Sequence, residues 1–562
     1  MDNNNYFKNS FSEDIFRNKY AQGPSDDWGQ LSERLVEDVC GSRWATTTPL
    51  MSKEDRARLV VLVKQLKFIP GGRYLYYAGR PYKAFNNCYL LRGEEDTREE
   101  WASLSQKSMS CLTTGGGIGT DYSVFRASGK TLSRTGGKSS GPLPLMDAIN
   151  EIGRNVMQGG SRRSAIYASL NWQHEDVYKF LRAKNWFEQP IGKQLKADGT
   201  PYTFADAKEE DFNFPARLDM TNISVNYDNA ALNMGLINNP VFLENCRQAM
   251  TTGEPGFSFN FGDKERETLR NACTEVTSED DSDVCNLGSI NLGEIANIDE
   301  FTEVVNLASK FLVCGTLRAD LPYKKVYEVR EKNRRLGLGL MGIHEWLLQR
   351  GCTYEVTPEL KKWLAVYRDE SKRSADEHCD RLFISRPVAY RAIAPTGTIG
   401  ILAATTTGIE PLFSVAYKRR FLTEGTKWKY KYVIDGVADR LIREYGVDPS
   451  SIETAYSLAN NYEKRIKFQA DVQDYVDMSI SSTINLPRWG SKGNSELDLE
   501  RFSETLAKYA PRLRGFTCYP DGSRGGQPIV EVDYKFAQNH KDAIYEEVDI
   551  CEITGHGGSC GV

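Results

Sequence analysis

The sequence has few histidines, no long hydrophobic run and no excess of positive charge. Five histidines occur in 562 residues, and none follows a glutamate by three positions, so this chain alone is not expected to build a carboxylate–histidine di-iron centre. No apolar run approaches the roughly 18 residues of a membrane-spanning helix, so we predict no membrane contact. Lysine and arginine total 71 against 76 acidic residues, which leaves no basic field to hold a nucleic-acid polymer.

Cysteine is also sparse. Twelve cysteines in a chain of this length are too few for a disulfide scaffold. They form no close C-x-x-C pairs, so we predict no bound metal, and this absence argues against a thiol metal-storage protein. The first residues, Met1-Asp2-Asn3-Asn4-Asn5, contain no basic region followed by an apolar stretch, so no secretory signal is predicted. The expected location is therefore reducing and cytoplasmic.

What the sequence does contain is an alternation of helical and strand-like segments. Residues 1–65 are polar and helical, with apolar residues spaced for one buried face. From residue 66 to about 535, strand-like and helical segments alternate, which predicts an α/β architecture with a largely parallel sheet. Residues 536–562 are polar and end in a Gly-rich stretch, which predicts a flexible tail. The buried face of the first region is predicted to comprise Trp28, Leu31, Leu35 and Val36.

Four segments of the middle region carry specific predictions. Apolar residues on one stripe predict a helix over Phe301–Leu312. A second helix is predicted to begin at Thr357-Pro358, because a hydroxyl cap is followed there by proline. Strands are predicted at Val388–Ile393 and Ile399–Ala403.

Two neighbouring segments concentrate thiols and polar groups. The first is Asn271-Ala272-Cys273-Thr274-Glu275, and the second begins at Cys285 with the sequence CNLGSINLG. In an extended segment Asn271, Cys273 and Glu275 would project from one face. A cysteine in such a place is a candidate nucleophile, metal ligand or radical carrier. The alternative is a buried cysteine in a polar loop, but the second segment and the upstream Cys88 favour a functional site.

These segments resemble ribonucleotide reductase. The same resemblance is carried by Asn333–Gly342 (NRRLGLGLMG) and Ala394–Gly400 (APTGTIG), and it runs from about Phe68–Arg73 to the C-terminal cysteines. It implies a ten-stranded α/β barrel with a central finger loop, a small N-terminal helical region and a flexible, redox-active C-terminal tail. The implied domains are 1–65, 66–535 and 536–562.

The resemblance also implies roles for individual residues. Cys273 would form a transient thiyl radical that abstracts the 3′ hydrogen of the substrate ribose. Glu275 would be the general base on the 3′ hydroxyl, and Asn271 would hold the ribose hydroxyls. Cys88 and Cys285 would be the dithiol that supplies two electrons and becomes a disulfide.

A loop rich in small residues is the candidate phosphate site. Small residues and backbone N–H groups suit a phosphate, and this loop resembles the family's substrate-phosphate loop. Asn87, next to Cys88, is expected to contact substrate as well. The stretch Gly115–Gly119 lacks a preceding strand, so we interpret it as a packing turn and not as a dinucleotide fingerprint. The loop residues are Pro395, Thr396, Gly397, Thr398 and Ile399.

Ser133–Gly141 and Gln158–Ser164 resemble the two loops that read an allosteric effector, a deoxynucleotide or ATP. In dimeric relatives that site lies at the subunit interface, so the resemblance implies a homodimer. Solvated surface loops are the alternative interpretation. The candidate effector residues are Asp147, Lys138, Gln158, Arg162 and Arg163.

The C-terminal pair Cys551 and Cys560 resembles the shuttle that re-reduces the active-site disulfide. Flanking glycines permit many backbone conformations, and exchange with thioredoxin or glutaredoxin would complete the cycle. A disordered terminus with incidental cysteines is the alternative.

The class of reductase depends on the segment Thr517–Gln527. Class I catalytic chains carry adjacent tyrosines there, whereas this chain has only Tyr519. The single tyrosine favours class II, which uses adenosylcobalamin. The alternative is a class I large subunit that binds no cofactor directly, receives its radical from a separate metal-containing subunit and uses Tyr519 for radical transfer.

A catalytically silent nucleotide-binding partner is the remaining alternative. The presence of Cys88, Cys273, Glu275 and Cys285 together argues against it. Six further cysteines are predicted to be packing residues, namely Cys40, Cys111, Cys246, Cys314, Cys352 and Cys379.

Overall fold

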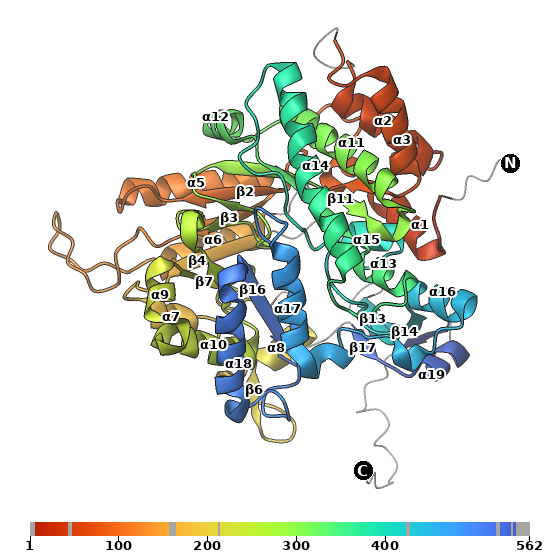
Figure 1. The fold of residues 1–562 in the computed structure, drawn as a ribbon. Helices are drawn as coiled ribbons and strands as arrows, with labels where there is room; N and C mark the ends of the chain where they lie inside the picture. Colours follow the sequence, from red (N-terminus) through yellow and green to blue (C-terminus); the bar gives the residue numbers. More distant parts are fainter. Residues whose placement is uncertain are drawn as a thin grey trace.

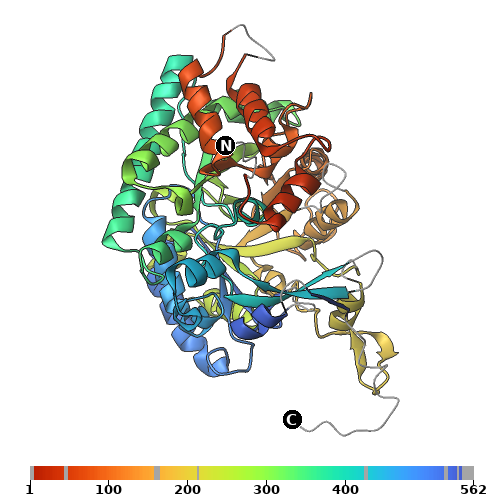
Figure 2. The same ribbon diagram turned by 90° about the vertical axis from the view of Figure 1, so that its right-hand side faces the viewer.

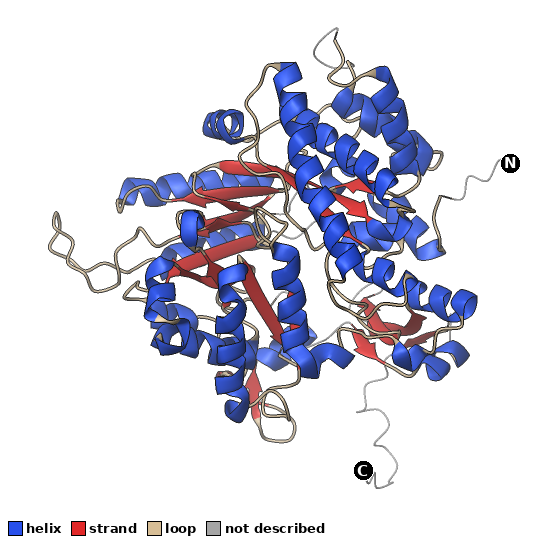
Figure 3. Cartoon of the chain, viewed as in Figure 1, coloured by secondary structure: helices blue, strands red, loops and turns tan. Residues whose placement is uncertain are grey.

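The computed structural model describes residues 6–42, 48–156, 165–211, 214–422, 428–523, 529–540 and 543–546. Its main sheet contains ten strands, and helices surround them (Figures 1 and 3). None of the described helices is long and apolar enough to cross a membrane.

The main sheet consists of two parallel halves. In one half β2, β3, β4, β7 and β8 pair in parallel. In the other half β11 pairs in parallel with β12, and β15 with β16. The halves meet in antiparallel fashion at β2–β11 and at β8–β16, while β1 pairs with β11 outside this arrangement. The bounds are β1 Phe68–Pro70, β2 Cys88–Arg92, β3 Gly117–Asp121, β4 Ile166–Asn171, β7 Thr221–Tyr227, β8 Gly256–Phe259, β11 Asp283–Asn291, β12 Leu336–Met341, β15 Thr483–Leu486 and β16 Gly515–Pro520.

Single parallel bridges close the sheet into a ring. Leu338 bridges Arg391, and Ile393 bridges Ile480, so residues 391–393 connect β12 to the segment leading into β15. The predicted strand Val388–Ile393 therefore occupies a strand position in the ring, but it forms only these isolated bridges. The predicted barrel is confirmed.

The predicted strand Ile399–Ala403 is wrong, because these residues belong to helix α15, Gly397–Ala403. Thr396 has a left-handed backbone conformation with φ of 52°, and Gly400 N–H donates to Thr396 C=O at 2.7 Å, which starts a helical turn. Periodicity does not distinguish a strand from a helix in so short an apolar run.

The outer helices confirm the other predictions. Residues 6–65 include α1 Ser10–Lys19, α2 Trp28–Cys40 and α3 Lys53–Lys64, and α2 buries the predicted apolar face. The helix predicted over 301–312 is α11, Ile298–Arg318. The helix predicted at Thr357 is α14, Pro358–Leu382, capped by the Thr357 hydroxyl, which accepts from Leu360 N–H at 3.1 Å. Figure 1 shows α2, α3, α11 and α14 on one side of the barrel.

The remaining helices cover the other sides of the barrel or connect its strands. Five of the six cysteines predicted to pack are buried, and Cys352 is half-buried. The bounds are α4 Gly72–Tyr77, α5 Arg98–Thr113, α6 Leu143–Asn155, α7 Val177–Leu181, α8 Phe204–Glu210, α9 Asn229–Met234, α10 Pro240–Thr252, α12 Lys324–Asn333, α13 Ile343–Gln349, α16 Gly436–Tyr445, α17 Tyr462–Gln473, α18 Leu499–Tyr509 and α19 Tyr534–Asn539.

Two small sheets lie outside the barrel. One has the order β17-β13-β14-β18 and the other is the hairpin β5-β6, which extends from the body of the molecule in Figure 2. Their bounds are β5 Pro190–Leu195, β6 Pro201–Thr203, β13 Ala416–Leu422, β14 Trp428–Ile434, β17 Ile529–Glu531 and β18 Ile544–Glu546.

A finger loop lies inside the ring, between the paired two-residue strands β9, Leu269–Arg270, and β10, Thr277–Ser278. Asn222 of β7 donates to the Ala272 carbonyl at 3.0 Å. On the opposite side Ser479 N–H donates to the Glu275 carbonyl at 2.9 Å. Both halves of the barrel therefore hold the backbone of this loop.

Gly119 of β3 allows the loop to approach the barrel wall. A Cβ at this position would lie 1.6 Å from the Arg270 carbonyl oxygen, so Gly119→Ala forces the backbone of the finger loop to move. We expect the free energy of unfolding to fall by about 1–3 kcal/mol. The matched control is Gly436→Ala, whose Cβ would meet only Asn9 Nδ2 at 3.7 Å. Chemical denaturation measures both variants, and a Gly119→Ala protein as stable as the natural one would contradict this account.

Candidate active site

A cavity of about 170 Å³ lies at the tip of the finger loop. It brings together residues from the finger, from β2 and from the loop before α15. Among the residues that line it are Asn87, Cys88, Ala272, Cys273, Glu275, Pro395, Thr396, Gly397, Thr398 and Ile399. The structure brings these residues, which are distant in the sequence, into one cavity.

The finger tip is a turn and not the extended segment that we predicted. Thr274 has φ of 69°, and its N–H donates to the Asn271 carbonyl at 2.9 Å. The turn leaves Cys273 exposed and buries Asn271 and Glu275. Asn271 braces it further, since its Oδ1 accepts from Val276 N–H at 2.9 Å. The three side chains gather because the chain turns, and strand alternation is not the cause.

Cys88 and Cys285 lie opposite each other on adjacent strands. They are directly opposite in the antiparallel register of β2 and β11, and the side chains of opposite residues lie close together. Asn271 Nδ2 donates to Cys88 Sγ at 3.0 Å, which connects the finger loop to this pair. Burial raises the pKa of both thiols well above the usual range, and for Cys88 the neighbouring Glu275 raises it further.

Glu275 is the buried carboxyl of the cavity. Burial raises its pKa to about 7, and the hydrogen bond from Asn271 acts in the opposite direction. Within the described residues, Glu275 Oε2 and Asn87 Oδ1 are buried acceptors with no hydrogen-bond partner. Buried polar atoms ordinarily find a partner, so these two acceptors are available to a hydrogen-bond donor that enters the cavity.

The loop before α15 forms another wall of the cavity. Thr396 Oγ1 accepts from Gly408 N–H at 2.8 Å, so the hydroxyl of Thr396 fastens the loop to the segment that follows the helix. A Cβ at Gly397 would meet nothing within 4 Å, so the backbone there is open to a ligand. Exposed N–H groups at the start of a helix suit an anion.

The cavity residues that the sequence analysis missed include Tyr20, Arg73 and Ser289. Arg73 and Ser289 lie in segments that carry the family resemblance, which was the only available signal. Tyr20 follows α1, and no sequence pattern connects it to the finger loop. Gly115 and Gly117 also line the cavity. Because β3 begins at Gly117 and so follows the first glycines, they are not a dinucleotide fingerprint.

Other predicted residues lie away from the cavity or outside the described residues. Asp147 of α6 is paired with Arg217 at 2.9 Å, and the exposed Lys138 donates to Thr131 Oγ1 at 3.0 Å. Tyr519 of β16 lines a different pocket. The predicted residues outside the described part of the chain are Gln158, Arg162, Arg163, Cys551 and Cys560.

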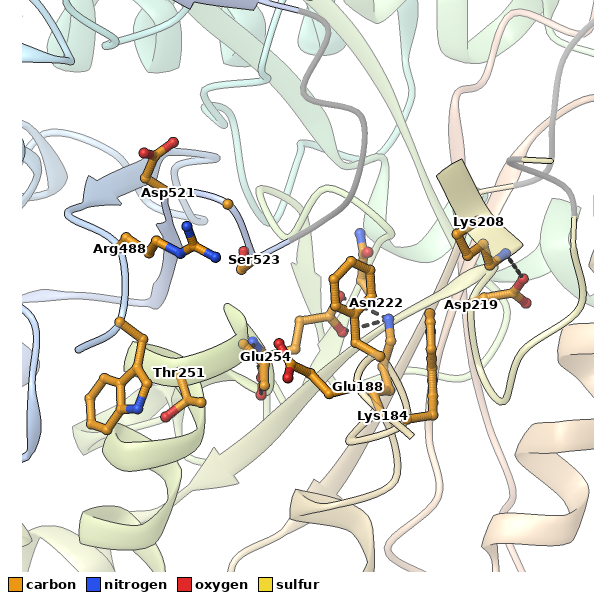
Figure 4. A pocket seen from close by; sticks show the side chains of 15 residues that line it. Lys184, Glu188, Lys208, Asp219, Asn222, Thr251, Glu254, Arg488, Asp521 and Ser523 are labelled. Atoms are coloured by element: carbon orange, nitrogen blue, oxygen red, sulfur yellow. Dashed lines mark hydrogen bonds and ion pairs between the residues drawn. The ribbon is translucent and has the colours of Figure 1, made fainter. Parts of the chain in front are cut away.

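A larger pocket, of about 500 Å³, is shown in Figure 4. Asn222 lines it and also donates to the Ala272 carbonyl, so its side chain connects this pocket to the residue before Cys273. Lys184 pairs with Glu254 at 2.8 Å and Lys208 with Asp219 at 2.6 Å, and these pairs give the pocket polar walls. Its aromatic lining includes Trp186, Phe187 and Trp489. Within the described residues, no cluster of three or more His, Cys, Asp or Glu side chains could hold a metal ion.

Comparisons with known proteins identify the family of this chain. The family model for the ribonucleotide reductase barrel domain matches residues 86–226, 259–363 and 386–510. The chain is 26% identical to a vitamin B12-dependent ribonucleoside-diphosphate reductase of Mycobacterium tuberculosis, over 92% of this chain and 80% of that protein. It is 24% identical to the protein of the same name from Thermoplasma acidophilum, over 84% of this chain and 66% of that protein. It is 24% identical to the ribonucleoside-diphosphate reductase subunit alpha of Chlamydia trachomatis, over 52% of this chain and 32% of that protein. The chain therefore belongs to the ribonucleotide reductase family.

The raised pKa of Glu275 predicts a pH-dependent cost to stability. Its pKa rises from an ordinary 4.5 to about 7 in the folded chain, so the folded state holds this proton more tightly and loses stability as the pH rises from 4.5 to 7. At pH 8 we expect the free energy of unfolding of Glu275→Gln to exceed that of the natural protein by up to about 3 kcal/mol. Near pH 4.5 this difference should vanish. Denaturant titrations at both pH values measure this. Equal stabilities at pH 8 would contradict it.

Proposed function

We propose that this chain reduces ribonucleotides to 2′-deoxyribonucleotides by radical chemistry at Cys273. The observation that supports the proposal most directly is the cavity in which Cys273 lies with Glu275 and beside the opposed pair Cys88 and Cys285. A thiyl radical suits hydrogen abstraction, because S–H and activated C–H bonds have similar strengths and the transfer is reversible.

Each side chain has a role that fits its environment. The thiyl radical of Cys273 takes the 3′ hydrogen of the ribose, and Glu275 accepts the proton of the 3′ hydroxyl. A pKa of about 7 suits a general base at neutral pH. Asn271 and Asn87 hold the ribose hydroxyls. Cys88 and Cys285 then supply two electrons as the 2′ hydroxyl leaves as water, and they become a disulfide.

The substrate phosphates bind in the loop from Pro395 to Ile399. Gly397 leaves its backbone open, and the Thr396–Gly408 hydrogen bond holds the loop in place. This arrangement puts the phosphates at one wall of the cavity and the ribose against the finger tip. We further propose that Cys551 and Cys560 re-reduce the disulfide with electrons supplied by thioredoxin or glutaredoxin.

We also propose an effector site and a dimer. Asp147 and Lys138 hold a deoxynucleotide or ATP together with Gln158, Arg162 and Arg163, and the site lies at the interface of a homodimer. The exposed pair of Asp147 and Arg217 is available to rearrange when such a ligand binds, since exposed ion pairs contribute little stability.

Adenosylcobalamin is the proposed cofactor, as the names of the two vitamin B12-dependent relatives suggest. When bound, it supplies the one-electron oxidation that turns a nearby thiol into a thiyl radical. The pocket of Figure 4 has room for part of such a group, and its tryptophans and polar side chains suit a flat base and amides. Trp186, Trp489 and Arg488 would hold it, and Asn222 fixes the carbonyl of the residue before Cys273.

The class I alternative needs a path for the radical through Tyr519. Tyr519 lines a separate pocket, to which Tyr456 also contributes. In the sequence, neither neighbour of Tyr519 is a second tyrosine. This favours the cobalamin-dependent proposal.

The deciding experiment is an assay of the purified full chain with adenosylcobalamin, a ribonucleotide, an effector and a dithiol. We expect deoxyribonucleotide to form without any metal-containing subunit. Activity that appears only when a ferritin-like subunit is added would overturn the class II assignment in favour of class I.

Cys273→Ser tests the radical role. We expect no detectable reduction, because an alkoxyl radical on serine is much harder to generate than a thiyl radical, while nucleotide binding stays nearly unchanged. Glu275→Gln is the comparison, and losing a general base should leave activity lower by ~10²–10⁴-fold. Measurable turnover by Cys273→Ser in a single-turnover assay would reject the role of Cys273.

A further inference from the structure

The two opposed cysteines have different access to the cavity. Cys88 lines the cavity and keeps 7% of its surface exposed. Cys285 is fully buried and is not among the cavity-lining residues. Its sulfur is covered from behind by β12, where a Cβ at Gly337 would lie 3.0 Å from Cys285 Sγ. A thiol that enters through the cavity therefore meets the sulfur of Cys88 first.

The charged groups that act most strongly on the pKa of the two thiols differ in sign. Glu275 lies on the Cys88 side and raises the pKa of that thiol. Arg335, which directly precedes β12, lies on the Cys285 side. Burial raises the pKa of the Cys285 thiol, the Arg335 guanidinium lowers it, and the carboxylates of Asp283, Glu275 and Asp477 raise it. Among the charged groups, Arg335 has the largest effect on the pKa of the Cys285 thiol.

Arg335 is held in this position by a buried network. Its Nε donates to Asp283 Oδ2 at 2.9 Å, and its Nη2 donates to Ser278 Oγ at 3.4 Å. Ser278 in turn donates to Asp283 Oδ2 at 2.6 Å. All three side chains are buried. The cation thus connects the base of the finger loop to the strand that carries Cys285, and its Nη1 has no partner among the described residues.

We propose that the Cys88–Cys285 disulfide is opened in one direction, by attack on the sulfur of Cys88 and departure of Cys285 as a thiolate beside Arg335. The inference rests on the proposed dithiol role of these cysteines. An incoming thiolate R–S⁻ forms a bond to Cys88 Sγ, the Cys88–Cys285 bond breaks, and its electron pair stays on Cys285. A second thiolate of the reductant then displaces Cys88, and two protons restore the dithiol.

The order of attack is read directly from a trapped intermediate. The full-length protein is oxidised with diamide, mixed briefly with glutathione, quenched in acid and alkylated after unfolding. Peptide mapping should find glutathione on Cys88 and the alkyl group on Cys285. The reverse pattern, or equal amounts of both, would overturn the inference.

Variants of Arg335 test the role of the charge. The departing thiolate leaves faster when its pKa is lower, so we expect Arg335→Met to slow reduction of the disulfide by about tenfold and to move the alkylation profile of Cys285 to higher pH. Arg335→Lys should retain most of the rate. The matched control is Arg334→Met, because Arg334 is equally buried but bonds to Ser385, Thr316 and Glu331 on another side.

Each outcome separates this inference from the proposed function. An unchanged rate in Arg335→Met, or equal slowing in Arg334→Met, would show that the charge does not direct the exchange, and turnover could still follow the proposed route. If neither diamide nor turnover joins Cys88 to Cys285, both the inference and the dithiol role fail. The mapping experiment uses the natural sequence, so it decides the direction of attack even if a variant does not fold.

Discussion

The site depends on the close contact between the finger loop and the barrel wall. Gly119 leaves room for the Arg270 carbonyl, and Asn222 and Ser479 hold the loop from opposite sides of the ring. Backbone polar groups of the loop that are buried inside the barrel need hydrogen-bond partners, and Asn222 and Ser479 supply them. These few contacts decide where Cys273 lies relative to Cys88, Glu275 and the residues at the start of α15.

Buried charges hold the base of the same loop. Burial alone would raise the pKa of Glu267, but Arg514 and Arg335 lower it to about 2, and Thr277 donates to Glu267 at 2.7 Å. Arg270 bonds Asn260 Oδ1 at 2.7 Å. At the tip the pKa of Glu275 is raised instead, because among the described residues no cation offsets the effect of its burial. The base is therefore rigidly paired, whereas the tip keeps a carboxyl that can exchange a proton near neutral pH.

Much of this arrangement was predictable from residues that carry a local signal. The caps and apolar stripes of α11 and α14 follow from short-range spacing, and the motifs around Cys273, Cys285 and Pro395 indicated the family. The segment Ile399–Ala403 was wrongly assigned because five apolar or small residues fit either a strand or a helix. The extended conformation expected for 271–275 was wrong for a related reason, since the turn at Thr274 is imposed by the barrel that encloses it.

The sequence by itself pointed to the residue types of the candidate site, namely a cysteine close to a carboxyl and an amide, two further cysteines and a segment of small residues. It did not determine their distances, because Cys88, Cys273 and Thr396 are far apart along the chain. The tertiary structure alone decided that Cys88 faces the cavity while Cys285 lies behind it, that Tyr20 joins the site, and that burial raises the pKa of Glu275. These properties depend on strand register and on exclusion of water, and both arise only when the ring of strands closes.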